Sequence, residues 1–311
     1  MSSDKGGNNL VKRRALIYLL GVEWSNPNGD PSMDNAPRIY EDKVFTTDVF
    51  LKRRIRDYVY DKYGKKDEEE YLSNKDKSKK RNIIFFRRDI KESGEILTPE
   101  KRTKKLEIEY IDDAKNLCWD IRVFGALVPI KGKGGGKGEG WAIYGPVQFT
   151  FGTSIHPVDY IDVQITSVLA HSEGKAKGGS MGIKPIVPVT IIEYYGFVND
   201  YTAEDTGMSE KDYEKLREGL LNLREAHSAN TATKNIVPLA LIEVEFKNNK
   251  YAYLKGLIET KEAPKTSIRE SKIDLGKLIE KLGELGVEYI VYIKQEFKDI
   301  FENLPKEVKY F

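Results

Sequence analysis

The candidate functional groups of this sequence begin with two aspartates in an unusual loop. Residues 25–38 are SNPNGDPSMDNAPR, in which Asn, Asp, Gly and Pro each favour turns. A loop of this length without regular structure is usually functional or disordered. Asp30 and Asp34 are placed to hold a metal ion or to activate an RNA 2′-hydroxyl, although their Pro and Gly neighbours favour a turn-forming role. The loop is therefore either a shaped site or ordinary connecting chain.

Other signals of catalysis or metal binding are weak. His156, His171 and His227 show neither HxxxH nor HExxH spacing. The single Cys118 excludes an internal disulfide and a cysteine metal cluster. The glycine-rich segment 131–140 lacks the GxxxxGK[ST] pattern of a phosphate-binding loop. We therefore expect no catalytic residue, no cofactor and no metal ion.

Basic residues form three separate groups, each of which alone suits a solvated surface. Two of the groups lie in glycine-rich segments, where backbone N–H groups can approach phosphate oxygens closely. Together they favour a polyanion whose sugar-phosphate chain is bound without regard to base identity. The groups are Lys52, Arg53 and Arg56 on a predicted helix; Lys131, Lys133 and Lys137 in a loop; and Lys175, Lys177 and Lys184 at a predicted hairpin tip.

The overall composition is that of a globular protein. The 311 residues are 40% hydrophobic and carry a net charge of +2, so the total charge says little about partners. No run approaches the roughly 18 apolar residues of a membrane helix. Met1–Asn9 is polar and shows no signal pattern. The absence of a long apolar run and of a signal pattern, together with the single cysteine, predicts a cytoplasmic protein without membrane contact.

Hydrophobic periodicity predicts the elements that position the loop and the first basic group. Ala15–Val22 is a short apolar run, typical of a buried strand. Thr46 or Thr47 then caps a helix. At about 100° per residue, the first basic group shares one arc beside the buried face of this helix. The residues of that buried face are Leu51, Ile55, Tyr58 and Val59.

The rest of the chain predicts an α+β fold of the split βαβ kind, with helices on one face of the sheet. A charged segment over 61–81 is expected to be exposed. A long hairpin projects between the strands at 160–169 and 186–197, carrying the third basic group at its tip. Further strands are predicted over 82–90, 145–151, 238–246 and 287–293, and helices over 117–128, from Ser209 with a capping box, and over 274–285 with Gly286 as the C-cap.

Several runs resemble one known family. GVEWSNPNGDPSMDNAPR and FTTDVFLKRRIRDYV are similar to the start of the CRISPR-associated Cascade backbone subunit, the "Cas seven" family of the RAMP superfamily, and most similar to its type I-B branch. In HSANTA (227–232), Asn230 and Thr231 replace the basic residue of a family motif. The other matching runs are NLCWDIRVFGALV (116–128), GPVQFTFGTSIHPV (145–158), MGIKPIVPV (181–189), GFVN (196–199) and TGMSEKDYEKL (206–216).

The resemblance implies a modified RRM-like (ferredoxin-like) palm in a single domain, 1–311. Finger-like insertions would occupy about 61–115, a β-hairpin thumb about 160–189, and a C-terminal helix–strand extension about 259–311. The implied function is non-enzymatic. Copies of the subunit would line up along a crRNA as a helical filament, with other Cascade subunits, and present the guide for pairing with target DNA.

The resemblance also implies roles for individual residues. The first basic group would contact guide phosphates, the thumb lysines would contact a strand, and Met181 would be an apolar wedge. The loop at 131–140 is a second candidate contact, and Arg38 is a candidate contact to RNA or to a neighbouring subunit. In type III relatives a loop aspartate cuts RNA, so a metal-dependent endoribonuclease using Asp30 or Asp34 is the alternative, and a stand-alone RNA-binding module is a third.

Overall fold

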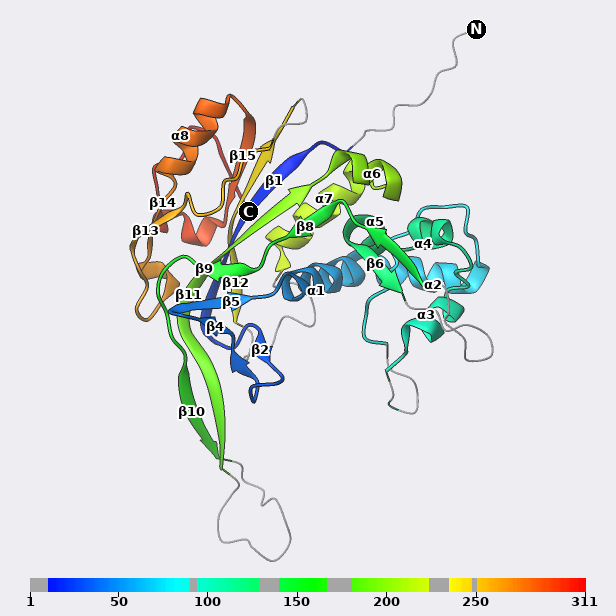
Figure 1. The fold of residues 1–311 in the computed structure, drawn as a ribbon, viewed down its shortest axis with the longest axis horizontal. Coiled ribbons are helices and arrows are strands. Elements are labelled where there is room, and N and C mark those ends of the chain that lie inside the picture. The colour runs from blue at the N-terminus through cyan, green and yellow to red at the C-terminus, as the bar shows by residue number, and fades with distance from the viewer. Residues whose placement is uncertain are drawn as a thin grey trace, which may run out of the picture.

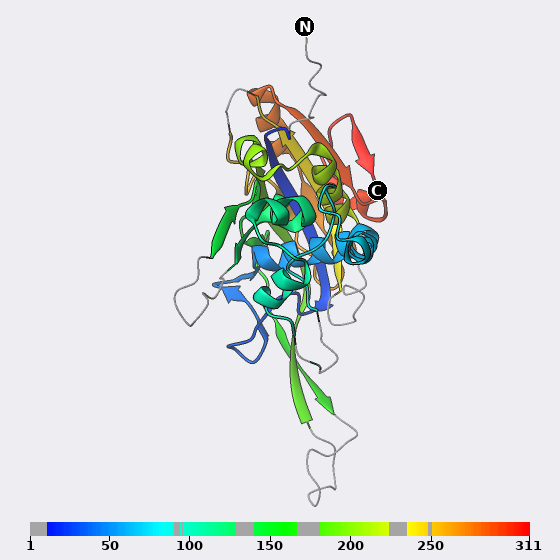
Figure 2. The ribbon, with the colours of Figure 1, turned by 90° about the vertical axis from the view of Figure 1, so that its right-hand side faces the viewer.

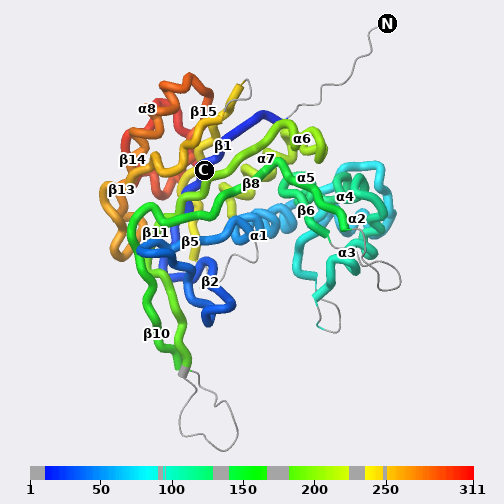
Figure 3. The backbone as a smooth tube through the Cα atoms, viewed as in Figure 1, coloured from blue at the N-terminus to red at the C-terminus, as the bar shows by residue number. Residues whose placement is uncertain are grey.

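A ten-stranded, mainly antiparallel sheet forms the centre of the protein (Figures 1 and 3). The computed structural model describes residues 11–89, 94, 96–128, 140–166, 181–223, 235–247 and 251–311. The strands lie in the order β17 (Val308–Tyr310), β15 (Glu288–Ile293), β12 (Ile236–Glu245), β1 (Arg14–Ser25), β11 (Met181–Val198), β9 (Gly152–Ser154), β5 (Lys43–Thr46) and β4 (Ile39–Tyr40), and both β8 (Val147–Phe149) and β10 (Ile161–Thr166) pair with β11.

The central strand β1 confirms the strand predicted from its apolar run. It pairs antiparallel with β11 on one side and β12 on the other. Every residue from Arg14 to Val22 is buried. Because successive side chains of a strand point to opposite faces, a continuous apolar run requires a hydrophobic layer on each side of the sheet.

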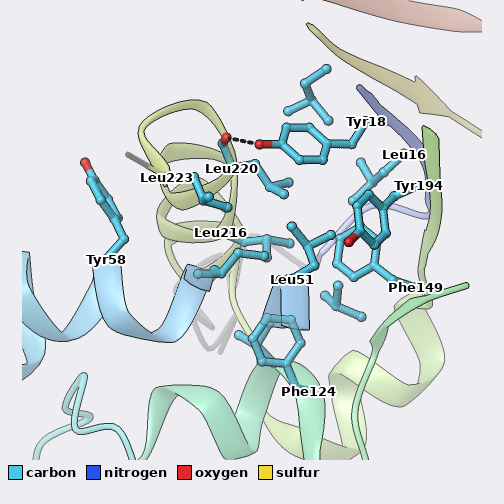
Figure 4. Packing of buried hydrophobic residues seen from close by; sticks show 14 of the residues in the cluster. Leu16, Tyr18, Leu51, Tyr58, Phe124, Phe149, Tyr194, Leu216, Leu220 and Leu223 are labelled. Atoms are coloured by element: carbon cyan, nitrogen blue, oxygen red, sulfur yellow. Dashed lines mark hydrogen bonds between the residues drawn. The ribbon is translucent and has the colours of Figure 1, made fainter. Parts of the chain in front are cut away.

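One layer is built by α1 (Asp48–Val59), α5 (Trp119–Phe124) and α7 (Glu210–Leu221). Figure 4 shows Leu16 and Tyr18 of β1 facing Leu51 of α1 and Leu216 of α7. The hydroxyl of Tyr18 donates a hydrogen bond of 2.9 Å to the carbonyl of Leu220. Fully burying each such side chain stabilises the fold by about 1.5–3 kcal/mol. This layer holds α1 flat against the sheet.

Local capping signals fix where the two main helices of this layer begin. Thr47 is the N-cap of α1 and accepts a hydrogen bond from the backbone N–H of Phe50. Ser209 and Asp212 form the predicted capping box of α7. Each cap satisfies backbone donors that the helix itself leaves unpaired. Both predicted starts are confirmed.

The second layer corrects the expectation of helices on one face only. Leu278 and Leu282 of α8 (Gly276–Leu285) pack in one cluster with Ile17 and Leu19 of β1. Figure 1 places α8 on the opposite side of the sheet from α1. Gly286, with φ +61°, ends α8 as predicted. This layer also contains β13 (Glu259–Glu262), β14 (Lys272–Asp274), β16 (Phe301–Glu302) and the 3-10 helices η4 (Ile268–Glu270) and η5 (Gln295–Ile300).

The segment over 61–81 is exposed along much of its length, as predicted, but it is largely helical and packs through the buried Glu68, Tyr71 and Arg81. A π-helical turn, η1 (Tyr60–Gly64), continues α1 into α2 (Lys65–Asn74). Tyr71 is fully buried and donates a hydrogen bond to the carbonyl of Leu106. With α3 (Pro99–Lys105) and α4 (Ile111–Leu117), these helices enclose a third hydrophobic cluster. Figure 2 shows this insertion in front of the sheet.

Of two further predictions next to the insertion, the strand over 82–90 is wrong and the helix over 117–128 is only partly right. In the described part of this segment, 82–89, Ile83 alone forms a β-bridge, to Cys118. The helix predicted over 117–128 is broken at Cys118, where the N–H of Trp119 bonds to the carbonyl of Ile83, and it ends at Gly125, with φ +77°. The chain then forms a ribbon of β6 (Gly125–Val128) and β7 (Trp141–Tyr144).

Buried charges hold the insertion together. Arg102 is 3% exposed and donates to both carboxylate oxygens of Glu68, to Asp89 at 2.9 Å and to the carbonyl of Ile84. Burial opposes ionisation of Glu68, but the hydrogen bond and charge of Arg102 outweigh it and lower the pKa of this carboxyl group. The pKa of Asp89 is lowered in the same way, with Lys105 as its hydrogen-bond donor.

Acidification is therefore expected to destabilise the insertion. Because the folded-state pKa values of Glu68 and Asp89 are lowered, their stabilisation is present above the ordinary values of 4.5 and 3.8 and is lost as the pH falls below them. Urea unfolding between pH 7 and pH 3 measures this loss. Glu68→Gln should flatten the pH dependence, whereas the exposed control Glu69→Gln should leave it unchanged. Equal profiles for the two variants would contradict the assignment.

The predicted hairpin is present as a projection from the body (Figures 1 and 2). Strand β10 pairs with β11 from Ile161 opposite Ile186 to Thr166 opposite Met181. Ile161, Ile165 and Ile183 are 42%, 50% and 70% exposed. Residues 167–180 lie outside the described residues. No helix in the described part of the chain is both long and apolar enough to cross a lipid bilayer.

Candidate nucleic-acid interface

The loop at 25–38 is an ordered turn. Its two-residue strands β2 (Gly29–Asp30) and β3 (Ala36–Pro37) pair with each other. One oxygen of Asp30 accepts hydrogen bonds from the N–H and hydroxyl of Ser32, and the other accepts from Arg38 at 2.7 Å. The hydrogen bonds from Ser32 and the charge of Arg38 lower the pKa of Asp30. Asp34, with φ +49°, occupies the left-handed conformation of a turn.

The same loop is fastened to the start of α1. The side-chain oxygen of Asn28 accepts hydrogen bonds from the N–H of Thr47 at 2.8 Å and from its hydroxyl at 3.0 Å. Asn28 therefore orients the residue that caps α1. Among the described residues, no group of three His, Cys, Asp or Glu side chains is arranged to hold a metal ion. The geometry of the loop therefore indicates that its role is to position the start of α1.

A large cleft lies beside α1. It has a volume of about 950 Å³ and is bordered by α1, the β6–β7 ribbon and α6 (Asp200–Thr206). We call it the first cleft. Tyr144 and Leu127 on its rim are 86% and 75% exposed. Its other lining residues include Asp48, Lys52, Arg56, Phe86, Phe124, Gln148, Asn199 and Tyr251.

Lys52 lies in the first cleft with its charge already neutralised. Its ammonium group is 3.0 Å from Asp48, one turn earlier in α1, and donates a hydrogen bond of 2.9 Å to Gln148 of β8. The side chain is 9% exposed. These two partners hold the amine in one position, where a phosphate group can replace Asp48 as its counter-ion.

Arg56 is the best-positioned cation of the first cleft. Its Nε donates a hydrogen bond of 3.0 Å to Asp120, which is fully buried. The guanidinium lies 4.9 Å from the ring centre of Phe124 and 5.5 Å from that of Phe86. Burial lowers the pKa of Arg56, but arginine stays protonated in proteins. Among the described residues, its two terminal nitrogens have no hydrogen-bond partner.

This arrangement suits an anion with several acceptor oxygens. A guanidinium held at Nε and stacked on aromatic rings presents its remaining N–H groups in a fixed fork, which matches phosphate. An exposed aromatic side chain, such as Tyr144, close to an anchored guanidinium is typical of surfaces that bind single-stranded nucleic acid. The geometry of the cleft therefore favours a sugar-phosphate ligand.

Comparison with known proteins identifies the family of this chain. The family model described as CRISPR-associated protein Cas7 matches residues 12–276. This chain belongs to the Cas7 family. A relative, the CRISPR-associated protein Cas7 of Haloferax volcanii, is 25% identical over 296 residues, covering 88% of this chain and 83% of the relative. The family predicted from the sequence is confirmed, and the type I-B branch remains a prediction.

Two solved structures share the fold of this Cas7-family chain. A chain of "CRISPR RNA-guided surveillance complex, pre-nicking" aligns with a TM-score of 0.56 at 13% identity, over 96% of each chain. A chain of "CRISPR RNA-guided surveillance complex" aligns with a TM-score of 0.50 at 13% identity, over 94% of this chain and 95% of the other. At this identity the likeness concerns the mixed α/β fold alone.

The structure separates the first basic group of this Cas7-family chain. Lys52 and Arg56, four residues apart, share the first cleft, but Arg53 lines a different one and pairs with Asp57. The predicted arc is therefore divided between two clefts, because residue i+1 is turned by about 100° from residue i, whereas residue i+4 returns to nearly the same side.

The remaining predicted site residues are not gathered at the first cleft. Arg38 forms an ion pair with Asp30, and Lys184 lies opposite Val163 on the projecting hairpin. Met181 lies at the last described pair of that hairpin. Five predicted contacts fall outside the described residues: Lys131, Lys133, Lys137, Lys175 and Lys177.

The groups that orient Arg56 and Lys52 were not predicted from the sequence. Asp120 lies in the run CWDIRVF, where a lone carboxylate among buried residues is a usable signal, because a buried charge requires a partner. Phe86 and Gln148 carry no comparable signal. Their roles depend on contacts between segments that are distant in the chain.

Proposed function

We propose that this Cas7-family chain is a non-catalytic backbone subunit that binds crRNA in a type I-B-like Cascade. In this proposal the central sheet with α1 and α7 is an RRM-like palm within a single domain, 1–311. The insertion at about 61–115 forms the fingers, the hairpin at about 160–189 forms the thumb, and residues 259–311 form a C-terminal extension. The protein acts in the cytoplasm and needs no cofactor.

The observation that carries the proposal is the position of Arg56. Its guanidinium is anchored by Asp120, stacked near two phenylalanines and open to a large cleft. A phosphate of the guide RNA completes this site, with Lys52 beside it. These contacts reach the sugar-phosphate chain, so binding is independent of guide sequence. The lysines at 131–137 and 175–184 add phosphate contacts, Arg38 a contact to RNA or a neighbouring subunit, and Met181 a wedge between bases.

Assembly along the guide is supported by the projecting hairpin. A two-stranded ribbon is marginally stable alone in water, and this one exposes Ile161, Ile165 and Ile183. A second copy that covers these isoleucines stabilises the ribbon. In this proposal a hairpin on one copy meets a different surface on the next, so copies repeat head to tail, and a rotation between copies that does not close a ring produces a helical filament. The filament presents the guide for pairing with target DNA and joins other Cascade subunits.

Mixing the purified protein with single-stranded RNAs of increasing length tests the proposal. Mass measured by light scattering should rise in steps with RNA length, because each added length of RNA accommodates another copy. One protein per RNA at every length would indicate a stand-alone RNA-binding module. Regular Mg²⁺-dependent RNA cleavage that is lost in Asp30→Ala or Asp34→Ala would indicate the endoribonuclease instead.

A further inference from the structure

A second cleft separates α1 from the insertion. Its volume is about 630 Å³, and we call it the second cleft. Four arginines line it, together with apolar residues that include Ile96, which is 52% exposed. Phe86 lines both clefts, so their surfaces are continuous at this ring. The four arginines are Arg53, Arg87, Arg88 and Arg102.

Two of these arginines are structural. Arg102 uses its terminal nitrogens on Glu68, Asp89 and the carbonyl of Ile84. Arg87 lies 3.8 Å from the ring centre of Tyr60 and forms longer ion pairs, of 3.4 and 3.3 Å, with the same two carboxylates. These contacts fix the floor of the second cleft.

The other two arginines present open guanidinium groups. Arg53, on α1, is 44% exposed and uses only Nε, which donates to Asp57 at 2.7 Å. Arg88 follows the buried Phe85 on the insertion side and is exposed. Within the described ranges, neither the terminal nitrogens of Arg53 nor any nitrogen of Arg88 has a hydrogen-bond or ion-pair partner. One open guanidinium therefore comes from α1 and one from the insertion.

Counted over the residues that the structure describes, the second cleft keeps a positive charge after its internal ion pairs are formed. The four arginines and Lys105 face three described carboxylates, those of Asp57, Glu68 and Asp89, which leaves two cations in excess. Those two match the open groups of Arg53 and Arg88. A ligand of this cleft is thus an anion, and the apolar floor beside Phe86 suits one that carries planar rings.

We propose that the second cleft binds the phosphodiester backbone of a nucleic-acid strand, with Arg53 and Arg88 as its phosphate ligands. Guanidinium groups bind phosphate through paired N–H donors, and bases stack on aromatic rings irrespective of sequence. An acidic protein segment would also satisfy the charges; the aromatic ring of Phe86, shared with the first cleft, favours a ligand whose phosphates are accompanied by stacking bases. The inference rests on the proposed function, because it adds a second phosphate site to the same nucleic-acid surface.

The test compares two double variants that each remove two charges from the protein. Arg53→Gln/Arg88→Gln alters the second cleft, and Lys66→Gln/Lys104→Gln removes two exposed lysines of the same insertion. Binding is measured as a function of salt, first with single-stranded RNA and then with complementary single-stranded DNA added to the RNA-loaded protein. The cleft variant should lose about tenfold or more in affinity, and its salt slope should fall by about 1.4, or roughly 0.7 for each phosphate contact. The lysine control should change little.

The two arms identify the strand. A loss in the RNA arm means that the guide passes through the second cleft, and a loss confined to the DNA arm means that its complement does; both support the proposal. Equal behaviour of the two double variants in both arms overturns it. Binding of oligoglutamate that depends on Arg53 and Arg88, while nucleic-acid binding does not, also overturns it.

Failure of the proposed function is distinguishable from failure of this inference. If the wild-type protein binds no RNA, the proposed function itself fails. If only Arg56 variants lose RNA binding, the proposed function stands and the second cleft has no part in it.

Discussion

Asp120→Ala is expected to lower the free energy of unfolding by about 3–5 kcal/mol, the usual cost of leaving a buried charge without its partner. Asp120 is fully buried and accepts hydrogen bonds from the N–H groups of Phe85 and Phe86, at 2.8 and 3.0 Å, as well as from Arg56. Alanine leaves two backbone donors and one guanidinium unsatisfied. One substitution thus weakens the junction between the insertion and α1.

Urea unfolding of Asp120→Ala, Asp120→Asn and Asp112→Ala measures this effect. Asparagine keeps one acceptor oxygen and should cost less than alanine. Asp112 is 80% exposed and should change stability by less than about 0.5 kcal/mol. RNA affinity should fall for both Asp120 variants, because Arg56 loses its anchor. A stable Asp120→Ala protein with wild-type RNA affinity would show that this carboxylate positions nothing.

The parts of the fold that sequence predicts well are those with local causes. The caps at Thr47 and Ser209 and the stop at Gly286 each depend on residues within one helical turn, so their signals lie together in the chain. The central strand is predictable because its apolar run, Ala15–Val22, admits no exposed face. Local chemistry decides these features.

The charged insertion shows why the rest was not predictable. Glu68 is an unremarkable acidic residue in sequence, yet it is buried because Arg102, 34 positions later, neutralises it. The break at Cys118 has the same kind of cause, since Trp119 bonds to Ile83. Hydrophobic spacing alone predicts one continuous helix there. Partners distant in the chain override local pattern.

The candidate site was predictable in residue type but not in arrangement. The cationic helix was correctly located, and Lys52 and Arg56 do share a cleft. The counter-ions Asp48 and Asp120 hold Lys52 and Arg56, respectively, in place before any ligand binds. A cation count cannot distinguish such anchored groups from a solvated surface. The anchoring makes the functional prediction for Arg56 specific.

Arg56→Ala is expected to weaken RNA binding by roughly 10- to 100-fold, because a hydrogen bond to a charged group contributes about 1.5–3 kcal/mol. The loss should be equal for RNAs of different sequence, and the salt slope should fall by about 0.7. Fluorescence anisotropy with several RNAs over a range of salt concentrations measures both quantities.

Arg56→Lys separates the geometry of the site from its charge. Lysine keeps a cation beside Asp120, so the protein should stay folded, but it has no planar fork to stack near Phe86 and Phe124. If geometry matters, Arg56→Lys loses most of the affinity that Arg56→Ala loses, whereas the distant exposed control Lys211→Ala loses little. An Arg56→Lys protein with wild-type affinity would reduce the first cleft to a diffuse positive surface. Losses limited to particular RNA sequences would instead show that Arg56 contacts bases.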